Sequence, residues 1–321
     1  MDILNYDDFR KGNDNDSIEG VVWIVDYHKK EATRTYLEGQ LLSDEKIGFK
    51  VWMGPVFTAL TREDYIGRPI FIKGTISKQY NNINITEVFA VDESLYPKEL
   101  FKKKSPYDIK DLSMSFEEIL KLNLTDKGFN LIDNIMGITS NGEIYEKFKT
   151  NYAASSHHDN CPYGLMAHTY KCLKILNNFM NLYNWMNTYS ADANLSKEDF
   201  KDLLYIGIAL HDIGKIYEIN EDVYFEESFN THRIIGLETL FAHKQEILDT
   251  YNEHFYNLLV SILVGHHDIY GDKAKTLVAY LVHQIDCIDS IFTEAGQVLE
   301  NKVTTEPSGK RVDFNGSKFF L

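Results

Sequence analysis

Histidines and aspartates recur through the second half of the chain in an order that could build a metal site. They are His168, His211-Asp212, His232, His266-His267 and Asp286. Neutral imidazole binds Mn, Fe, Co, Ni or Zn, and carboxylate extends the range towards Mn and Mg. A lone histidine on an apolar helix face is usually a core residue. The prediction of a metal centre therefore depends on the ordered set as a whole.

Asp212 is the candidate for a ligand shared by two cations. It follows the apolar run LLYIGIAL, and its two carboxylate oxygens could bridge metals ~3.5–4 Å apart. Bound metals would lower the pKa of a water molecule and give hydroxide near neutral pH. We expect Lys215, one helical turn beyond His211, to neutralise a phosphate oxygen. Asp286 lies in a helix too apolar for an unpartnered carboxylate, so a metal ion is its natural partner.

Helices must position these residues, because apolar residues recur at helical spacing from about Ser113 onward. The pattern is seen in DFKDLLYIGIAL, NTHRIIGLETLFAH, HFYNLLVSILVGHH and AKTLVAYLVHQIDCIDSIF. Several of the metal candidates lie at the ends of these runs, where a polar side chain can face a shared cavity. The best strand signal in this half is Val223-Tyr224-Phe225, which indicates a small hairpin.

The first hundred residues instead predict five short strands. The segments SIEGVVWIVDY, RTYLEGQLLS, KIGFKVWMG, PIFIKGTISKQ and INITEVFAVD are rich in β-formers and are separated by turn-formers. Five strands in this length suit an OB-type Greek-key barrel, although another small barrel or sandwich fits the same pattern. The predicted fold class is α+β and multidomain. Its parts are an OB-type barrel over 1–95, a linker over 96–112, an all-α domain over 113–300 and a tail over 301–321.

Composition restricts the classes of function. With 321 residues and 44% hydrophobic residues the chain can bury two cores. A net charge of −15 argues against non-specific nucleic-acid binding through a basic face. The N-terminus has no apolar signal-peptide region, and no apolar run approaches the ~20 residues of a membrane span. The three cysteines form no CxxC pair. We therefore expect a cytoplasmic protein with no membrane partner.

The ordered set resembles the H…HD…H…H(H)…D signature of the HD phosphohydrolase superfamily. A closer likeness is to the YhaM-type 3′–5′ exoribonucleases, carried by AASSHHDNCPYGLMAHT, LLYIGIALHDIGKIYE, LVGHHDIYG, VHQIDCIDS and VDFNGSKFF. That family also has an N-terminal OB domain. The chain departs from it in two places. Tyr163-Gly164 stands where the family usually has two glycines, and IYGDKAKT replaces a Pro-rich loop after His267.

The resemblance implies a residue-by-residue site. Metal ligation would come from His168, His211, Asp212, His232, His266 and Asp286. His267 would be a further ligand or a phosphate contact, Lys215 would contact the scissile phosphate, and His158 would line the site. The expected cofactor is a pair of divalent ions, with Mn favoured over Mg, Fe, Co, Ni or Zn.

On the barrel, four residues are candidates for binding nucleic acid. Trp52 and Tyr80 could stack on bases, at ~1–3 kcal/mol per base, although an aromatic residue in a strand more often lies in the core. Lys73 and Lys78 could contact the phosphate backbone.

The resulting functional hypothesis is a metal-dependent 3′–5′ exoribonuclease. It would take the 3′ end of single-stranded RNA or DNA, attack the terminal phosphodiester with metal-bound hydroxide, and release nucleoside 5′-monophosphates. One alternative is an HD nucleotidase or cyclic-nucleotide phosphodiesterase, with the OB domain assembling a homo-oligomer. Another is a non-catalytic nucleic-acid-binding module.

Overall fold

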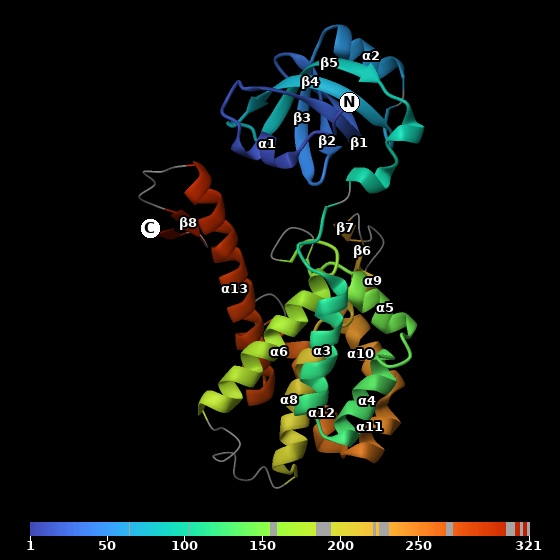
Figure 1. Ribbon diagram of the computed structural model, residues 1–321, viewed down its shortest axis with the longest axis vertical. Helices are drawn as coiled ribbons and strands as arrows, with labels where there is room; N and C mark the ends of the chain where they lie inside the picture. Colours follow the sequence, from blue (N-terminus) through green and yellow to red (C-terminus); the bar gives the residue numbers. More distant parts are fainter. Residues whose placement is uncertain are drawn as a thin grey trace. The chain divides into compact units, whose positions relative to one another are not determined.

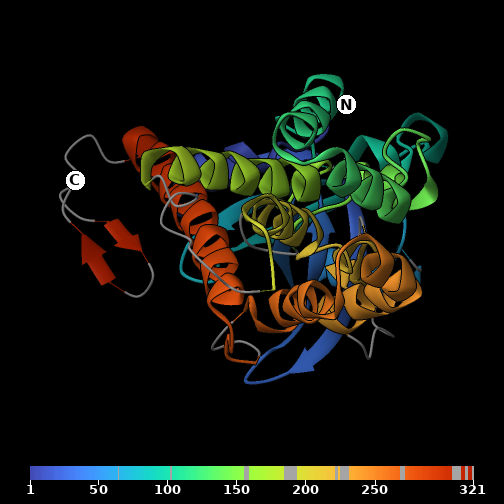
Figure 2. The ribbon, with the colours of Figure 1, turned by 90° about the horizontal axis from the view of Figure 1, so that it is seen from below.

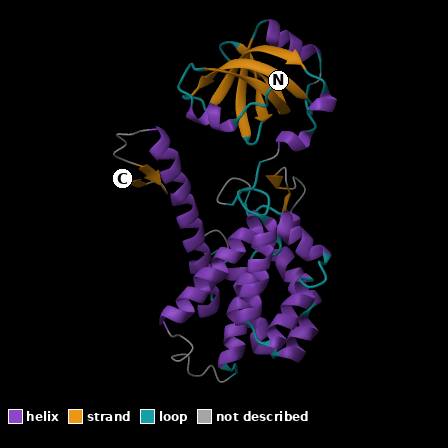
Figure 3. Cartoon of the chain, viewed as in Figure 1, coloured by secondary structure: helices purple, strands orange, loops and turns teal. Residues whose placement is uncertain are grey.

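The computed structural model describes residues 1–63, 65–101, 103–154, 159–183, 194–220, 223–224, 231–267, 272–305, 312–314 and 317–319. The chain forms two compact units, one made chiefly of Met1–Lys104 and the other chiefly of Ser105–Val303. Strands build the first unit and helices build the second (Figures 1 and 3).

The first unit is a closed five-stranded barrel. Its strands are β1 (Ser17–Glu31), β2 (Thr35–Leu42), β3 (Lys46–Trp52), β4 (Pro69–Ser77) and β5 (Asn82–Ala90). They follow one another around the barrel in the order β1-β2-β3-β5-β4. The pairs are antiparallel except for β3 and β5, which are parallel. Alternate residues such as Val22, Leu41 and Ile72 fill the interior. The prediction of an OB-type barrel is confirmed.

Short helices complete this unit. They are α1 (Tyr6–Lys11), α2 (Pro55–Arg62) and the 3₁₀ turns η1 (Glu93–Leu95) and η2 (Lys98–Phe101). The pair Gly54-Pro55, read from the sequence as a turn, is where α2 begins, because proline suits the first turn of a helix.

The range predicted as a linker, 96–112, is ordered at both ends. Phe101 is fully buried and its ring centroid lies 5.9 Å from that of Trp23, so η2 belongs to the barrel unit. Helix α3 already begins at Ile109, capped by the Asp108 side chain. The predicted linker was thus too long, because Tyr96, Phe101 and Tyr107 each hold part of this segment against a folded unit.

The second unit is a helical bundle. It contains α3 (Ile109–Asn123), α4 (Asp126–Met136), α5 (Glu143–Thr150), α6 (Gly164–Tyr183), α8 (Lys197–Leu210), α9 (Lys215–Glu218), α10 (His232–Ala242), α11 (Lys244–Thr250), α12 (Glu253–Gly265) and α13 (Leu277–Thr305). Two small hairpins accompany them, β6 (Ile219–Asn220) with β7 (Val223–Tyr224), and β8 (Val312–Phe314) with β9 (Ser317–Phe319). The first hairpin includes two of the three residues predicted as a strand, and the third, Phe225, lies outside the described residues.

Helix α8 lies in the middle of the bundle. Figure 2 shows it end-on between α6, α12 and α13. Every residue from Leu203 to Leu210 is buried, which explains why its sequence is apolar on all sides. Asp202, which directly precedes this run, is also buried but accepts hydrogen bonds from the Thr125 backbone and the Tyr251 hydroxyl. In the part of the chain that the structure describes, no helix is both long enough and apolar enough to cross a membrane.

Candidate metal centre

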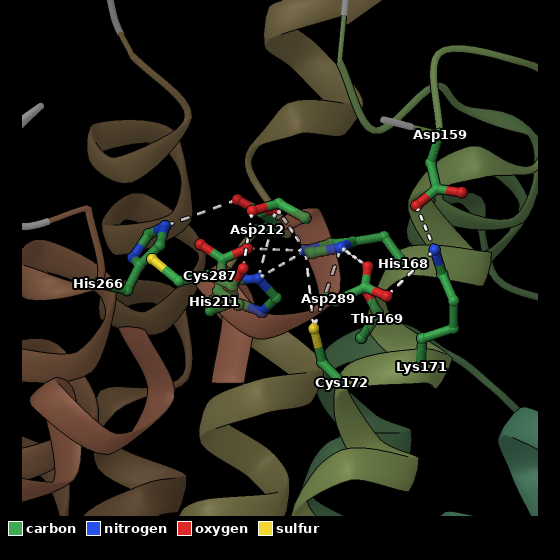
Figure 4. A network of polar contacts seen from close by, with 12 residues as sticks. Asp159, His168, Thr169, Lys171, Cys172, His211, Asp212, His266, Cys287 and Asp289 are labelled. Atoms are coloured by element: carbon green, nitrogen blue, oxygen red, sulfur yellow. Dashed lines mark hydrogen bonds and ion pairs between the residues drawn. The ribbon is translucent and has the colours of Figure 1, made fainter. Parts of the chain in front are cut away.

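Two pairs of polar residues follow directly on the ends of buried helices. His211-Asp212 comes after the last residue of α8, and His266-His267 comes after the last residue of α12. His168 lies within α6, His232 begins α10, and Asp286 lies within α13. The predicted ligands thus come from five helices, and the structure brings all of them together. Figure 4 shows four of them, His168, His211, Asp212 and His266.

Asp212 lies at the centre of this set, with one oxygen towards each of two groups. The Nε2 atoms of His168 and His211 lie 3.6 and 3.4 Å from its Oδ2. The Nε2 atoms of His232 and His266 lie 3.7 and 3.6 Å from its Oδ1. Each group is completed by one more residue, Asp286 beside His168 and His211, and His267 beside His232 and His266.

The tautomers of the four histidines follow from what their other ring nitrogen contacts. Each Nδ1 meets an acceptor outside the cluster. The acceptors are Asp289 for His168 (2.7 Å), the Ile208 carbonyl for His211 (2.7 Å), Glu218 for His232 (2.6 Å) and the Leu263 carbonyl for His266 (3.0 Å). Because an acceptor requires a proton on Nδ1, the Nε2 of each of these imidazoles, when neutral, presents a lone pair to the centre.

This arrangement fits divalent cations. Both Asp212 oxygens and the Nε2 of His266 are buried and make no hydrogen bond with any described residue. Facing Nε2 atoms are also close together, 3.3 Å between His168 and His211 and 2.6 Å between His232 and His267. Buried lone pairs that face one another without a proton or cation between them are costly. Positive charge at both groups would satisfy all of these atoms.

Lys215 supplies one positive charge at the centre. Its Nζ lies 2.7 Å from Asp212 Oδ2. Burial raises the pKa of Asp212, but Lys215 and His211 outweigh this and hold it well below its usual value. The expectation that Lys215 lies one helical turn beyond His211 was wrong, because α8 ends at Leu210 and turns connect it to α9. The ammonium contacts Asp212 instead.

The metal-free protein should lose stability below pH 6.5. Burial, followed by the charge of a neighbouring histidine, lowers the pKa of His267 to about 3 from its ordinary value of 6.5. Burial also lowers the pKa of His266. Below pH 6.5, His266 and His267 are therefore protonated in the unfolded chain but not in the folded protein, and for His267 this difference extends to about pH 3. Each contributes a loss of up to about 1.4 kcal/mol of unfolding free energy per pH unit as pH falls. His168, whose pKa is raised, has the opposite sign and acts above pH 6.5.

The test is urea denaturation in EDTA at several pH values between 6.5 and 5. His267→Asn should remove one of these proton uptakes and flatten the slope by up to about 1.4 kcal/mol per pH unit. Equal slopes for the variant and the wild type would contradict the prediction.

Three contributors to the site escaped the sequence analysis. Asp289 and Glu218 orient His168 and His232, as described above. His283, whose role the sequence left unassigned, points Nδ1 at the His266 carbonyl, 2.5 Å away. The available signal was the spacing in IDCID, which places Asp286 and Asp289 on one helix face.

Parts of the predicted site lie outside the described residues. These are His158 and, after His267, residues 268–271 of the altered loop. The other departure from the family is described. Tyr163 has φ of 68°, in the left-handed region that favours glycine, so the family's residue suits this position. Position 164 requires glycine for a steric reason, because a Cβ there would lie 1.9 Å from the Asp159 carbonyl oxygen.

On the barrel, the four nucleic-acid candidates separate into two kinds. Trp52 and Tyr80 are 49% and 60% exposed, as stacking would require. Lys78 is tied down, since its Nζ donates to the carbonyls of Phe9 (2.9 Å) and Arg10 (2.7 Å). Lys73 pairs with Glu19 at 3.1 Å. The prediction that Lys78 contacts a phosphate backbone does not fit the structure, because its ammonium stabilises the end of α1.

Tyr80 instead lies in a groove of about 570 Å³ that also contains Lys50, Lys46 and His28. The Lys50 ammonium lies 4.3 Å from the centre of the Tyr80 ring. Residues of β1, β2 and β3 and of the turn before β5 line the groove. Lys50, Lys46 and His28 were not among the predicted binding residues, because only the folded barrel brings strands β1 and β3 beside Tyr80.

Comparison with known proteins agrees with this geometry. Residues 165–291 match the model of the HD domain. The chain is 25% identical over 174 residues to the 3′-5′ exoribonuclease YhaM of Listeria welshimeri, and 27% identical over 176 residues to that of Listeria innocua. Each match covers 52% of this chain and 51% of the relative, so the chain spans about half the length of the curated relatives it matches. The His/Asp cluster falls within the matched region, so residues 165–291 form an HD domain, and the chain is similar to the YhaM exoribonucleases over about half its length.

Proposed function

We propose that the chain is a metal-dependent phosphohydrolase that removes nucleotides from the 3′ end of single-stranded RNA. Single-stranded DNA is a second substrate if it binds in the barrel groove that contains Tyr80 and Lys50. The observation that carries the proposal is the position of Asp212, whose two oxygens each face the Nε2 atoms of a different pair of histidines. A carboxylate between two nitrogen-rich groups is the arrangement of a two-metal phosphoesterase site.

The chain's own residues would hold the two ions. His168, His211 and Asp286 would bind one, and His232, His266 and His267 the other, with Asp212 between them. Mixed imidazole and carboxylate ligands suit Mn²⁺ as well as Fe²⁺, Co²⁺, Ni²⁺ and Zn²⁺, and we propose Mn²⁺. When bound, such ions lower the pKa of water and offset charge on a phosphate. Lys215 would then pair with a phosphate oxygen, because the cations take over the neutralisation of Asp212.

The substrate class follows from the YhaM relatives and from the barrel groove. Lys50 and Tyr80 combine a cation with an exposed aromatic face, which suits a nucleotide strand without regard to sequence. Glu38 and Asp26 also line the groove, so binding should be modest and sensitive to salt.

Two substitutions test the groove. Tyr80→Ala should weaken binding of a single-stranded oligoribonucleotide by about 5-fold or more, since one stacked base is worth ~1–3 kcal/mol. Lys50→Glu should weaken it by about 10-fold and make it less dependent on salt. Lys73→Glu is the matched control, because Lys73 lies outside the groove and pairs with Glu19. Fluorescence anisotropy at two salt concentrations measures all three. A loss with Lys73→Glu equal to that with Lys50→Glu would refute the groove as the binding surface.

The activity itself is tested on 5′-labelled oligonucleotides with protein stripped by EDTA and reloaded with Mn²⁺. The proposal expects a ladder of products shortened from the 3′ end, together with nucleoside 5′-monophosphates. Hydrolysis confined to mononucleotides or cyclic nucleotides would instead make the protein a nucleotidase or cyclic-nucleotide phosphodiesterase. Inactivity on every phosphoester under these conditions would leave a binding module.

A further inference from the structure

A second set of polar groups lies behind His168, on the side away from Asp212. It consists of Asp289 on α13, Lys171 on α6, and Asp159 and Tyr107, and we name it the Asp289 network. Figure 4 shows Asp289 between His168 and Lys171, with Asp159 beyond them. Among these, the carboxylates of Asp159 and Asp289 are almost completely buried.

Helix α13 contacts both ring nitrogens of His168. Asp286 Oδ1 lies 3.2 Å from Nε2, and Asp289 Oδ2 lies 2.7 Å from Nδ1. The two aspartates are three residues apart and therefore share one face of the helix. One helix thus supplies both a candidate metal ligand and the group that orients a second ligand.

Hydrogen-bond partners saturate the network. Lys171 Nζ donates to Asp159 Oδ2 at 2.7 Å and to Thr293 Oγ1 at 2.9 Å, and lies 3.2 Å from Asp289 Oδ1. These contacts use the three donors of an ammonium group. The Tyr107 hydroxyl donates to Asp159 Oδ1 at 2.5 Å. Each carboxylate oxygen in the network has its own partner, whereas Asp212 Oδ1 makes no hydrogen bond with a described residue and Asp212 Oδ2 faces the Lys215 ammonium together with two histidines.

This difference distinguishes Asp289, which positions a histidine, from Asp212, which is a candidate metal ligand. Cys172, His168 and Asp289 lie close enough together to suggest a further metal site. However, Nδ1 of His168 is already bonded to Asp289 Oδ2, and Asp289 Oδ1 faces the Lys171 ammonium at 3.2 Å. The atoms behind His168 are therefore occupied with one another.

We propose that Asp289 is the positioning residue for His168. It keeps the proton of the imidazole on Nδ1 and points Nε2 at Asp212 and Asp286, while Lys171, Asp159 and Tyr107 hold Asp289 in place. The inference rests on the proposed function only in treating His168 as a metal ligand, and it requires no particular substrate. Carboxylates that orient metal-binding histidines in this way typically change metal affinity 10- to 100-fold when removed.

The experiment is titration calorimetry of the metal-stripped full chain with Mn²⁺. Asp289→Asn keeps the shape of the side chain but loses its charge, and its amide can donate to Nδ1 and move the imidazole proton to Nε2. We expect Mn²⁺ affinity to fall at least about 10-fold. Asp202→Asn is the matched control, because Asp202 is equally buried in the same unit but hydrogen-bonds to Thr125 and Tyr251. It should lower the melting temperature in EDTA and leave Mn²⁺ affinity within about 2-fold.

Tyr107→Phe gives a second and milder test, since it removes a single hydroxyl and keeps the proposal testable if Asp289→Asn does not fold. It should weaken Mn²⁺ binding by about 2- to 5-fold, and its effect should not add to that of Asp289→Asn, because both act through one network. Wild-type Mn²⁺ affinity in both variants would overturn the proposal. If wild-type protein binds Mn²⁺ but does not shorten RNA, the exonuclease proposal fails and the positioning role stands. If wild-type protein binds no Mn²⁺, both fail.

Discussion

Asp212→Ala should abolish phosphodiester hydrolysis and remove most of the bound metal. Asp212 is the one described side chain that faces both candidate metal groups, with distances of 3.4 to 3.7 Å from its oxygens to four histidine nitrogens. Without it, each group keeps only its own residues and the charge between the groups is lost. A two-metal site supplies several kcal/mol of transition-state stabilisation, so the rate should fall at least about 1000-fold.

Elemental analysis after dialysis, together with hydrolysis of a chromogenic phosphodiester, measures both effects. Asp286→Ala is the informative comparison, because Asp286 belongs only to the group with His168 and His211. It should lose one of the two metals and keep the other. Retention of both metals by Asp212→Ala would exclude Asp212 as the shared ligand.

Lys215→Met should give a different phenotype, with normal metal content and a low kcat. In the metal-free protein the ammonium lies 2.7 Å from Asp212, and burial opposes its charge while Asp212 and Asp286 favour it and raise its pKa. Once cations neutralise these carboxylates, the ammonium is available for the phosphate. Removing one such donor from an active site costs about 100- to 1000-fold in kcat.

Steady-state kinetics and metal analysis on the same preparation separate this role from a structural one. Lys215→Arg keeps the charge and should recover part of kcat, whereas Lys201→Met, at another lysine beside a buried aspartate (Asp202), should be neutral. A variant Lys215→Met that loses its metals as well would show that the lysine supports the cluster rather than the phosphate.

Although their role as metal ligands stays a prediction, sequence order was enough to predict which histidines and aspartates lie together in one cluster. The same applies to the barrel, where alternation gave five strands close to their observed bounds. The groove could not be predicted in this way. His28, Lys46 and Lys50 become neighbours only after β1, β2 and β3 pair in register, and a lysine has no pattern that tells a binding residue from a solvated one.

The roles of the buried aspartates could not be predicted from the sequence either. Asp202, Asp212 and Asp289 all lie within or just after apolar helical runs, and nothing in their local sequence separates them. The distinction comes from distant partners such as Tyr251 and Lys171, which complete the hydrogen bonds of Asp202 and Asp289. At Asp212 the Lys215 ammonium faces one oxygen, and the other oxygen makes no hydrogen bond with any described residue, which makes Asp212 the chemical centre.

Helices α8 and α12, which end at His211-Asp212 and His266-His267, also determine whether metal or phosphate can bind first. The carboxyl end of a helix carries roughly half a negative charge, and both α8 and α12 direct this end at the cluster. Before metal binds, the centre therefore attracts cations and repels anions. Phosphate groups should therefore be excluded until bound metal has reversed the sign of the local field.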